Sequence, residues 1–305
     1  FFPLSQQIGF KSVFANCPAS KHWSSEYLAE MNSFYHFAKL DYKYLAECFK
    51  WDNFFASIQA NVGGRSLRLL DVACGSGKFP EALISDFEKR NVNIDSIEIS
   101  LLDPSSFSLD QATAVLKPPF NKTSSFEMKI QDFSFEARYF DILWAVHALY
   151  AVPKTDLRIA LQSCLDVLGS VGFIAHASKA SHYISYYDLF LKGFNSSDLP
   201  RFVCAEDILS MLKELKVNTR SFSINYSHRA LPTELSKVEG YLQRCVFDDQ
   251  ISMDKMLENE YTGKYLKDDC KANDGSWVFT QEVILIFFGD LSEITFDSFV
   301  GERKL

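Results

Sequence analysis

Residues 69–79 constrain the fold of this 305-residue chain more than any other stretch. They read LLDVACGSGKF, in which an apolar run ends in an acid and a turn of small residues leads into a helix-like segment. A strand that runs into such a turn lets the backbone approach a bound ligand, because no large side chain stands in the way. From residue 66 onward, strand-like and helix-like segments alternate, which predicts a parallel sheet with crossover helices.

The residues of the turn exclude two common nucleotide-binding motifs. A phosphate-binding P-loop needs a glycine five positions before the Gly-Lys pair and a serine or threonine after it, but Val72 and Phe79 occupy those positions. A dinucleotide-binding G-x-G-x-x-G motif fails as well, because Pro80 replaces its third glycine. The pattern that is left is D-x-A-C-G-S-G; the alternative is a chance glycine-rich turn in another kind of α/β protein.

This pattern resembles the first motif of the class I S-adenosyl-L-methionine (SAM)-dependent methyltransferases. The resemblance implies that Asp71, or an immediate neighbour, faces the amino-acid end of the cofactor, with Gly75 and Gly77 close by. Ala73 stands where the usual D-x-G-x-G-x-G pattern has its first glycine, which is a small departure. We therefore expect SAM as the cofactor and a Rossmann-like α/β fold with a seven-stranded sheet.

Composition narrows the class of protein further. With 47% hydrophobic and 15% aromatic residues the chain can bury a full core, and some of its 28 phenylalanines could line a pocket for an apolar or cationic ligand. A net charge of −8 argues against a nucleic-acid partner. Seven dispersed cysteines without a C-x-x-C pair predict a reduced, cytoplasmic protein without a metal site. No apolar run is long enough to predict a membrane span.

The pattern along the chain predicts one compact unit in four parts. These are an N-terminal helical lid segment (1–62), a SAM-binding core (63–226), a helical substrate cap (227–275) and a final core strand with a C-terminal tail (276–305). Strands are predicted at 66–72, 96–102, 126–131, 139–146, 171–176, 217–226 and 277–288. Helices are predicted at 24–60, 79–89, 106–116, 155–168, 183–192 and 205–214, with a mostly helical stretch at 233–268. The resemblance implies that the last two strands pair antiparallel, which would bring the cap near the ligand.

Two further acids follow predicted strands and are candidate cofactor ligands. Asp103, followed by Pro104, ends the second strand, where a carboxylate would hold the two hydroxyls of a ribose. The alternative for Asp103 is a helix cap, since the Asp-Pro pair also opens a helix well. Asp132 follows the third predicted strand, where this fold usually contacts the adenine edge, and the alternative is a plain loop acid.

The exit of the fourth predicted strand carries the candidate catalytic residues. His147 has an ordinary pKa close to neutrality, so it suits a general base or a residue that orients the substrate. Tyr150 follows on the same segment and would stand beside the transferred methyl group. The alternative for His147 is a hydrogen bond to the cofactor, or a place in the core.

Three segments are similar to the histamine N-methyltransferase family: the stretch 139–152, the Asp-Pro-Ser turn at 103–105 and the tract 183–247. The similarity implies a substrate site whose aromatic members are Tyr150, Tyr186, Phe190, Phe202 and Tyr241. The polar amine-binding residues of the family differ here: its glutamine corresponds to His147, its asparagine to Gln281, and its N-terminal glutamate to Asp41 or Glu47. An aromatic-walled site is expected, whereas these departures argue against histamine itself as the substrate.

We therefore expect a methyltransferase that acts on a small molecule, with nitrogen as the favoured acceptor atom. An O- or carboxyl-methyltransferase of specialised metabolism is the nearest alternative, with His147 deprotonating a hydroxyl. A noncatalytic methyltransferase-like domain, part of a longer synthase, is a third hypothesis, since the chain does not begin with Met. The protein is expected to be a monomer or a homodimer.

Overall fold

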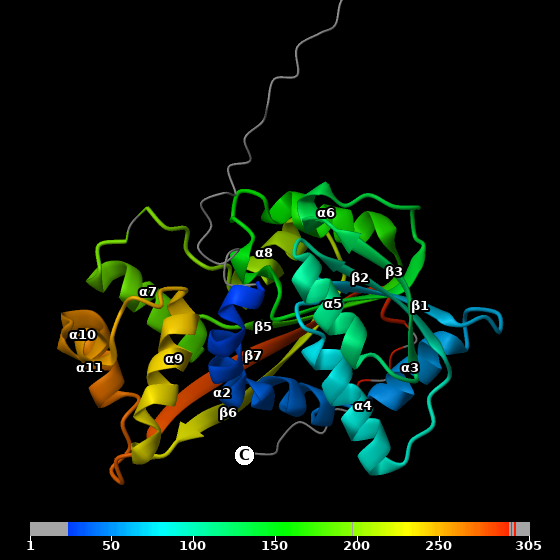
Figure 1. Ribbon diagram of the computed structural model, residues 1–305. Coiled ribbons are helices and arrows are strands. Elements are labelled where there is room, and N and C mark those ends of the chain that lie inside the picture. Colours follow the sequence, from blue (N-terminus) through cyan, green and yellow to red (C-terminus); the bar gives the residue numbers. More distant parts are fainter. Residues whose placement is uncertain (1–23, 197, 293, 295, 297–305) are drawn as a thin grey trace, which may run out of the picture.

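The computed structural model describes residues 24–196, 198–292, 294 and 296, and this part of the chain forms one seven-stranded sheet (Figure 1). The spatial order is β3-β2-β1-β4-β5-β7-β6, and β7 runs antiparallel to both of its neighbours. The strands are β1 (Leu67–Val72), β2 (Ile97–Asp103), β3 (Phe120–Glu127), β4 (Phe140–Val146), β5 (Leu168–Ala177), β6 (Thr219–Ala230) and β7 (Trp277–Gly289). The predicted fold class, including the antiparallel last pair, is confirmed.

Helices cover both faces of the sheet. The longer ones are α2 (Leu28–Glu47), α3 (Trp51–Gln59), α4 (Lys78–Arg90), α5 (Ser106–Val115), α6 (Leu157–Val167), α7 (His182–Gly193), α8 (Ala205–Glu214), α9 (Leu235–Val246), α10 (Met253–Glu258) and α11 (Glu260–Asp268). Short 3-10 turns lie at η2 (Ser25–Tyr27), η3 (Ile130–Asp132), η4 (Leu149–Ala151) and η5 (Pro232–Glu234). None of these helices is both long enough and apolar enough to cross a lipid bilayer.

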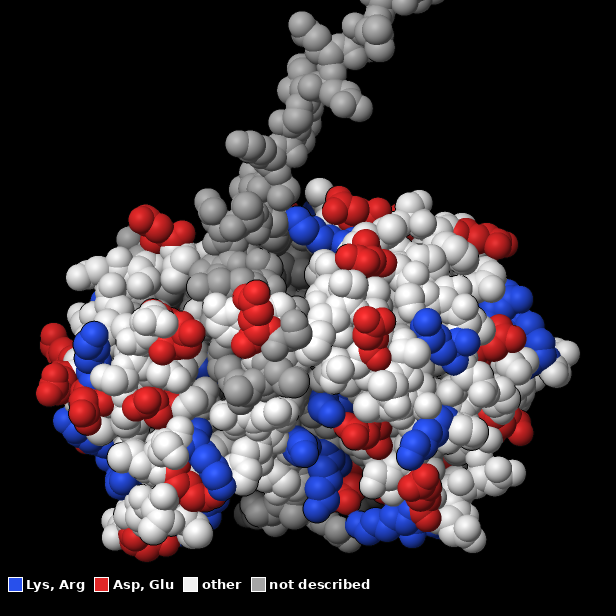
Figure 2. Space-filling view, viewed as in Figure 1, with Lys and Arg blue, Asp and Glu red and all other residues white. Residues whose placement is uncertain are grey.

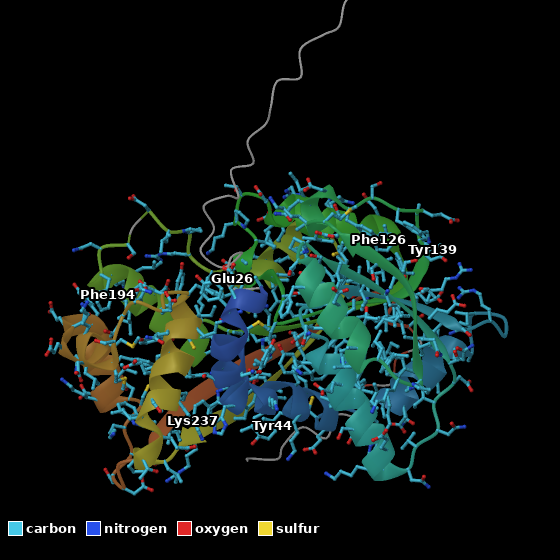
Figure 3. The ribbon with its side chains drawn as sticks, viewed as in Figure 1. Glu26, Tyr44, Phe126, Tyr139, Phe194 and Lys237 are labelled. Carbon is cyan, nitrogen blue, oxygen red and sulfur yellow. The ribbon has the colours of Figure 1, made fainter. Side chains whose placement is uncertain are left out.

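Alternation along the strands divides the core into two layers. Leu69 of β1 packs toward α3 and α4, whereas its neighbour Leu70 packs toward α6 and α8. β4 is buried at every residue, as expected for a central strand with helices on both faces. Side chains fill the space between sheet and helices (Figure 3). On the face in Figure 2, acidic and basic side chains are interspersed and form no extended patch of one sign.

Two predicted elements were placed wrongly. The third strand spans Phe120–Glu127 rather than 126–131. It is an edge strand in which only Phe120 is buried, so its sequence is mostly polar and the apolar residues that follow it were misleading. The predicted helix over 24–60 is interrupted at residues 48–50, between α2 and α3.

The segment between β6 and β7 is helical, as predicted, and contains α9, α10 and α11. It lies to one side of the sheet, and α2 lies between it and α4 (Figure 1). α9 packs against α2 and α7, while α11 packs against α7. A separate apolar cluster that includes Tyr186, Tyr241 and Trp277 holds these helices together. The first 23 residues of the predicted lid segment lie outside the described residues.

Candidate functional site

The turn after β1 shapes the floor of a cavity of about 400 Å³. Ala73, Gly75 and Gly77 all have positive φ, at 48°, 51° and 71°, a conformation that favours glycine. A Cβ on Gly77 would come within 2.9 Å of the Ala112 backbone and 2.7 Å of the Val115 side chain. The small residues of the turn therefore serve both the tight backbone path and the close packing of α4 on α5.

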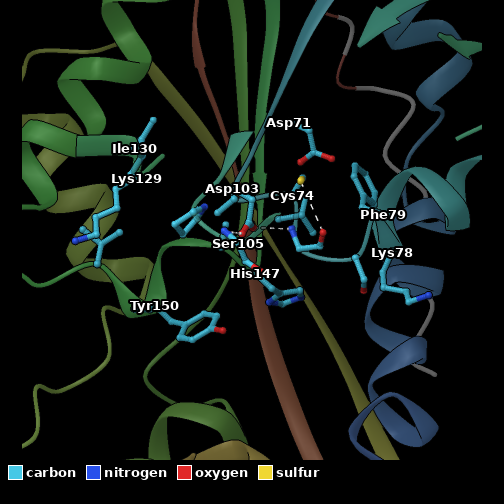
Figure 4. Close-up of a pocket in the computed structure, with 18 of the residues that line it drawn as sticks. Asp71, Cys74, Lys78, Phe79, Asp103, Ser105, Lys129, Ile130, His147 and Tyr150 are labelled. Carbon is cyan, nitrogen blue, oxygen red and sulfur yellow. Dashed lines mark hydrogen bonds between the residues drawn. The ribbon is translucent and has the colours of Figure 1, made fainter. Parts of the chain in front are cut away.

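Two buried carboxylates, Asp71 and Asp103, line this cavity (Figure 4). Asp71 is 4% exposed, and its Oδ2 has no hydrogen-bond partner among the described residues. Burial raises the pKa of Asp71 well above its ordinary value; the Trp144 side chain opposes this shift and the nearby Asp103 adds to it. The carboxylate of Asp103 accepts hydrogen bonds from the N–H groups of Gly75 (3.0 Å) and Ser105 (2.9 Å). Burial also raises the pKa of Asp103, and these two bonds oppose the shift.

The two carboxylates fit the two polar ends of SAM. The unpartnered Asp71 oxygen suits an ammonium group, because the ammonium would donate a hydrogen bond in place of the water from which burial separates this oxygen. The Asp103 carboxylate is fixed by two backbone N–H groups and keeps lone pairs for the hydroxyls of a ribose. Asp103 also follows the family pattern in its place at the end of β2, beside the crossover turn.

Lys129, Ile130 and Gln131, on the approach to η3 and within it, complete the cavity opposite the turn. Asp132, which the sequence predicted to contact the adenine edge, is exposed and does not line the cavity. The third strand ends at Glu127, earlier than predicted, and the preceding residue Gln131 lines the cavity instead of Asp132. Pro104 and Ser105 line the cavity next to Asp103.

A second, smaller cavity of about 90 Å³ adjoins the first, and we call it the acceptor chamber. Four residues line both cavities: Tyr35, Tyr42, His147 and Tyr150. Most of the chamber's other walls are aromatic or aliphatic, and they come from α2, β5, α7, α9 and the loops around them; they comprise Phe34, Asp41, His176, Ala177, Tyr183, Ile184, Phe202, Arg244, Cys245 and Phe247. A molecule in the chamber would lie next to a ligand in the large cavity.

His147 lies at the junction of the two cavities. Its backbone has a φ of +50°, and its N–H donates to the Ala175 carbonyl at 2.9 Å, which fixes the residue just beyond β4. Its ring meets that of Tyr42 edge-on, with centroids 5.9 Å apart. The Nε2 atom is buried without a hydrogen-bond partner among the described residues. Burial lowers the pKa of His147 below its ordinary value, so the ring is neutral at neutral pH.

Asp41 of α2 is the one carboxylate among the described residues that line the chamber. It is 2% exposed and accepts hydrogen bonds from the Tyr183 hydroxyl (2.7 Å) and from His228 Nε2 (2.6 Å). Burial alone would raise the pKa of Asp41, but the charge and hydrogen bond of His228, helped by Tyr183, lower it below the ordinary value. Asp41 is therefore ionised at neutral pH. Its alternative, Glu47, faces outward and pairs with Lys89.

Four predicted substrate residues do not line either cavity. Tyr186 and Phe190 are buried in the apolar cluster between α7 and the inserted helices. Tyr241 and Gln281 lie one layer behind the chamber: Gln281 donates to the Tyr241 hydroxyl at 3.2 Å, and that hydroxyl is 3.0 Å from His228 Nδ1. Tyr150 and Phe202, by contrast, line the chamber as expected.

Sequence reasoning missed several wall residues. Tyr35 and Tyr42 lie on the same helix as Asp41, and aromatic residues at helical spacing do not distinguish a cavity wall from ordinary core packing. Tyr183 and Arg244 of the chamber wall, and His228, which is bonded to Asp41, come from three other elements, and no local motif marks them. No group of three or more His, Cys, Asp or Glu in the described part of the chain could hold a metal ion.

Comparison with known families matches residues 69–172 to a family model described as "Methyltransferase domain". No curated protein sequence matches the chain. The solved structures that resemble it include magnesium protoporphyrin IX methyltransferase from Synechocystis PCC 6803 with bound S-adenosylhomocysteine (10% identity, TM-score 0.50, 90% of this chain and 100% of that one). Others are the YcgJ protein of Bacillus subtilis (13%, 0.46, 79% and 99%) and the plantazolicin methyltransferase BpumL (12%, 0.46, 90% and 94%).

The structural likeness establishes the class I methyltransferase fold. The matched domain begins inside β1 and ends inside β5, so it contains the turn, Asp71, Asp103 and His147. The matched domain and this fold make the chain a SAM-dependent methyltransferase with SAM as its cofactor.

Proposed function

We propose that this SAM-dependent methyltransferase methylates the amine nitrogen of a small molecule held in the acceptor chamber. The observation that carries the proposal is Asp41, an ionised carboxylate buried in an otherwise largely aromatic chamber next to the cofactor cavity. Tyr183 and His228 already offset the cost of burying this anion, and its remaining lone pairs can accept a hydrogen bond from a cationic or hydrogen-donating group beside it. Aromatic rings on the same walls favour a cation as well.

His147, at the junction of the two cavities, suits the proton transfer that N-methylation requires. SAM supplies an electrophilic methyl group on its sulfonium. The lone pair of a neutral amine forms the N–C bond as the C–S bond breaks, so an ammonium must first lose a proton. Nε2 of His147 is neutral, buried and available at the boundary of the two cavities, and we assign it as the acceptor of that proton. Alignment of the nucleophile by the chamber walls supplies much of the remaining rate.

The resemblance to the histamine N-methyltransferase family is part of this proposal. Tyr150, Phe202 and Asp41 line the chamber. On this proposal Asp41, rather than Glu47, corresponds to the N-terminal glutamate of the family. The same His147 nitrogen would also deprotonate a hydroxyl, so methylation of oxygen is the second candidate. The carboxylate of Asp41 favours nitrogen as the reacting atom, since the reacting oxygen of a phenolate or carboxylate placed beside Asp41 would be repelled by it.

The test compares Asp41→Asn with Glu47→Gln, using a panel of small amines and phenols and radiolabelled SAM. Both substitutions remove one acid from α2, but Glu47 faces outward and pairs with Lys89. Loss of a charge-assisted hydrogen bond of about 1.5–3 kcal/mol predicts at least a tenfold fall in kcat/KM for amines in Asp41→Asn. SAM titration checks that the cofactor cavity is intact in both variants.

Two results would contradict the proposal. One is wild-type protein that methylates phenols or carboxylic acids but none of the amines. The other is an Asp41→Asn variant that binds SAM and methylates amines as fast as Glu47→Gln does.

A further inference from the structure

The acceptor chamber also contains a buried cation. Arg244 lies in the last turn of α9, is 2% exposed and lines the chamber. Its guanidinium stands 4.9 Å from the ring centroid of Phe247, another wall residue. Arginine is rarely so completely buried, and a charge in such a place calls for a role in structure or binding. Its charge also reaches the hydroxyl of Tyr35, on the wall shared with the cofactor cavity: burial raises the pKa of Tyr35, and Arg244 opposes that rise.

Among the described residues that line the chamber, Arg244 and Asp41 give one charge of each sign. They come from α9 and α2, two helices that pack against each other. The other titratable nitrogens among the described wall residues are neutral, because burial lowers the pKa of both His147 and His176, the latter to about 4. The carboxylate of Asp41 is bonded to Tyr183 and His228. The chamber thus has two poles of opposite charge set in an aromatic wall.

Building on the proposed function, we infer that the methyl acceptor carries a carboxylate as well as the amine, as an amino acid or a short peptide does. Arg244 would bind the carboxylate and Asp41 the amine, with the aromatic walls packed on the side chain between them. One guanidinium matches the single charge and bidentate geometry of a carboxylate. A guanidinium has five N–H donors, so a structural partner of Arg244 and a substrate carboxylate can be held together.

The experiment uses matched pairs of acceptors with the wild-type protein and needs no substitution for its first result. The probes are histidine against histamine, tyrosine against tyramine, and phenylalanine against 2-phenylethylamine. The members of each pair differ only in the carboxylate. We expect the carboxylate-bearing member of at least one pair to have a kcat/KM tenfold higher or more, which corresponds to about 1.4 kcal/mol. Mass spectrometry of the tyrosine and tyramine products distinguishes nitrogen from oxygen methylation.

The variant Arg244→Gln tests whether Arg244 binds the carboxylate of the acceptor. Lys237→Gln is the matched control, because Lys237 lies on the same helix (Figure 3) but is exposed and pairs with Glu234. Arg244→Gln should reduce the preference for the carboxylate-bearing acceptor toward one, mainly by raising its KM, whereas Lys237→Gln should keep the preference. SAM titration and a thermal melt show whether Arg244→Gln is folded.

The outcomes separate this inference from the proposed function. If the wild-type protein methylates the decarboxylated amines as well as or better than their partners, the inference is wrong and N-methylation stands. If a folded Arg244→Gln variant keeps the full preference, Arg244 does not bind the carboxylate. If phenols are methylated and no amine of either kind is, the proposed function fails, and this inference fails with it.

Discussion

Replacing Asp103 by alanine should weaken SAM binding by about two orders of magnitude. Asp103 is 7% exposed and accepts hydrogen bonds from the N–H groups of Gly75 and Ser105. In the cofactor-bound protein its remaining lone pairs would accept two ribose hydroxyls. At about 1.5 kcal/mol for each of these two charge-assisted bonds, the loss is about 3 kcal/mol, or roughly 150-fold in Kd.

The substitution has a second effect that can be measured separately. The N–H groups of Gly75 and Ser105 lose their acceptor in the free and the bound protein alike. An unsatisfied buried donor costs about 1–3 kcal/mol, so the free energy of unfolding falls. The free and the SAM-bound protein pay the same cost, so this effect changes SAM affinity little. Asp103→Asn should restore part of the stability, because the amide oxygen still accepts an N–H bond. Its NH₂ group cannot accept a ribose hydroxyl, so SAM affinity should stay low.

Calorimetric titration with SAM and S-adenosylhomocysteine measures the affinity, and urea unfolding of the free protein measures the stability. Asp110→Ala is the control, since Asp110 lies exposed on α5, the helix that follows Asp103. A folded Asp103→Ala protein that binds SAM as tightly as Asp110→Ala does would refute the assignment of the ribose site. It would also show that the carboxylate only fixes the turn.

Two other substitutions test the stability of the fold. Gly77→Ala should lower the free energy of unfolding by about 2 kcal/mol or more, because strain at positive φ adds to overpacking against α5. Gly63→Ala is the control: its φ is +67° but no atom lies near the added Cβ, so it should cost only the backbone strain. His176 titrates near pH 4 when folded because it is buried, and near 6.5 when unfolded. Between these two pKa values the unfolded state binds more protons than the folded state, so the free energy of unfolding decreases as the pH is lowered, by up to about 1.4 kcal/mol per pH unit. Urea unfolding at pH 7 and 5 should show a smaller fall in His176→Gln than in the exposed-site control His36→Gln, and equal falls would contradict the assignment.

The cofactor half of the site could be predicted from the sequence because its parts are local. Asp71 ends an apolar run, the small residues follow at once, and Asp103 ends the next strand. Parallel strands place their carboxyl ends at one edge of the sheet, so consecutive motifs meet there without further information. Asp132 was misplaced because its predicted position depended on a polar edge strand, whose sequence has no clear pattern.

The acceptor half depends on contacts between elements far apart in the chain. Asp41 is hydrogen-bonded to His228, on β6, and to Tyr183, on α7. No spacing rule connects such positions, and a buried aromatic gives the same pattern whether it lines a chamber or fills a core. Tyr186 and Phe190 show this ambiguity, because they are aromatic as expected yet belong to the core behind the chamber.

The wall shared by the two cavities determines how substitutions should be interpreted. Tyr35, Tyr42, His147 and Tyr150 line both cavities, so changing any of them alters the cofactor site and the acceptor site together. Asp103 lines only the larger cavity and Asp41 only the smaller. Replacing Asp103 should therefore change the affinity for SAM and not for the acceptor, and replacing Asp41 should do the reverse. On the proposed function the reacting atoms meet at the shared wall, and His147 Nε2 is the buried ring nitrogen there without a partner among the described residues. A loss of kcat on replacing His147 therefore indicates proton transfer only if SAM affinity and acceptor KM, measured beside Asp103 and Asp41 variants, are unchanged.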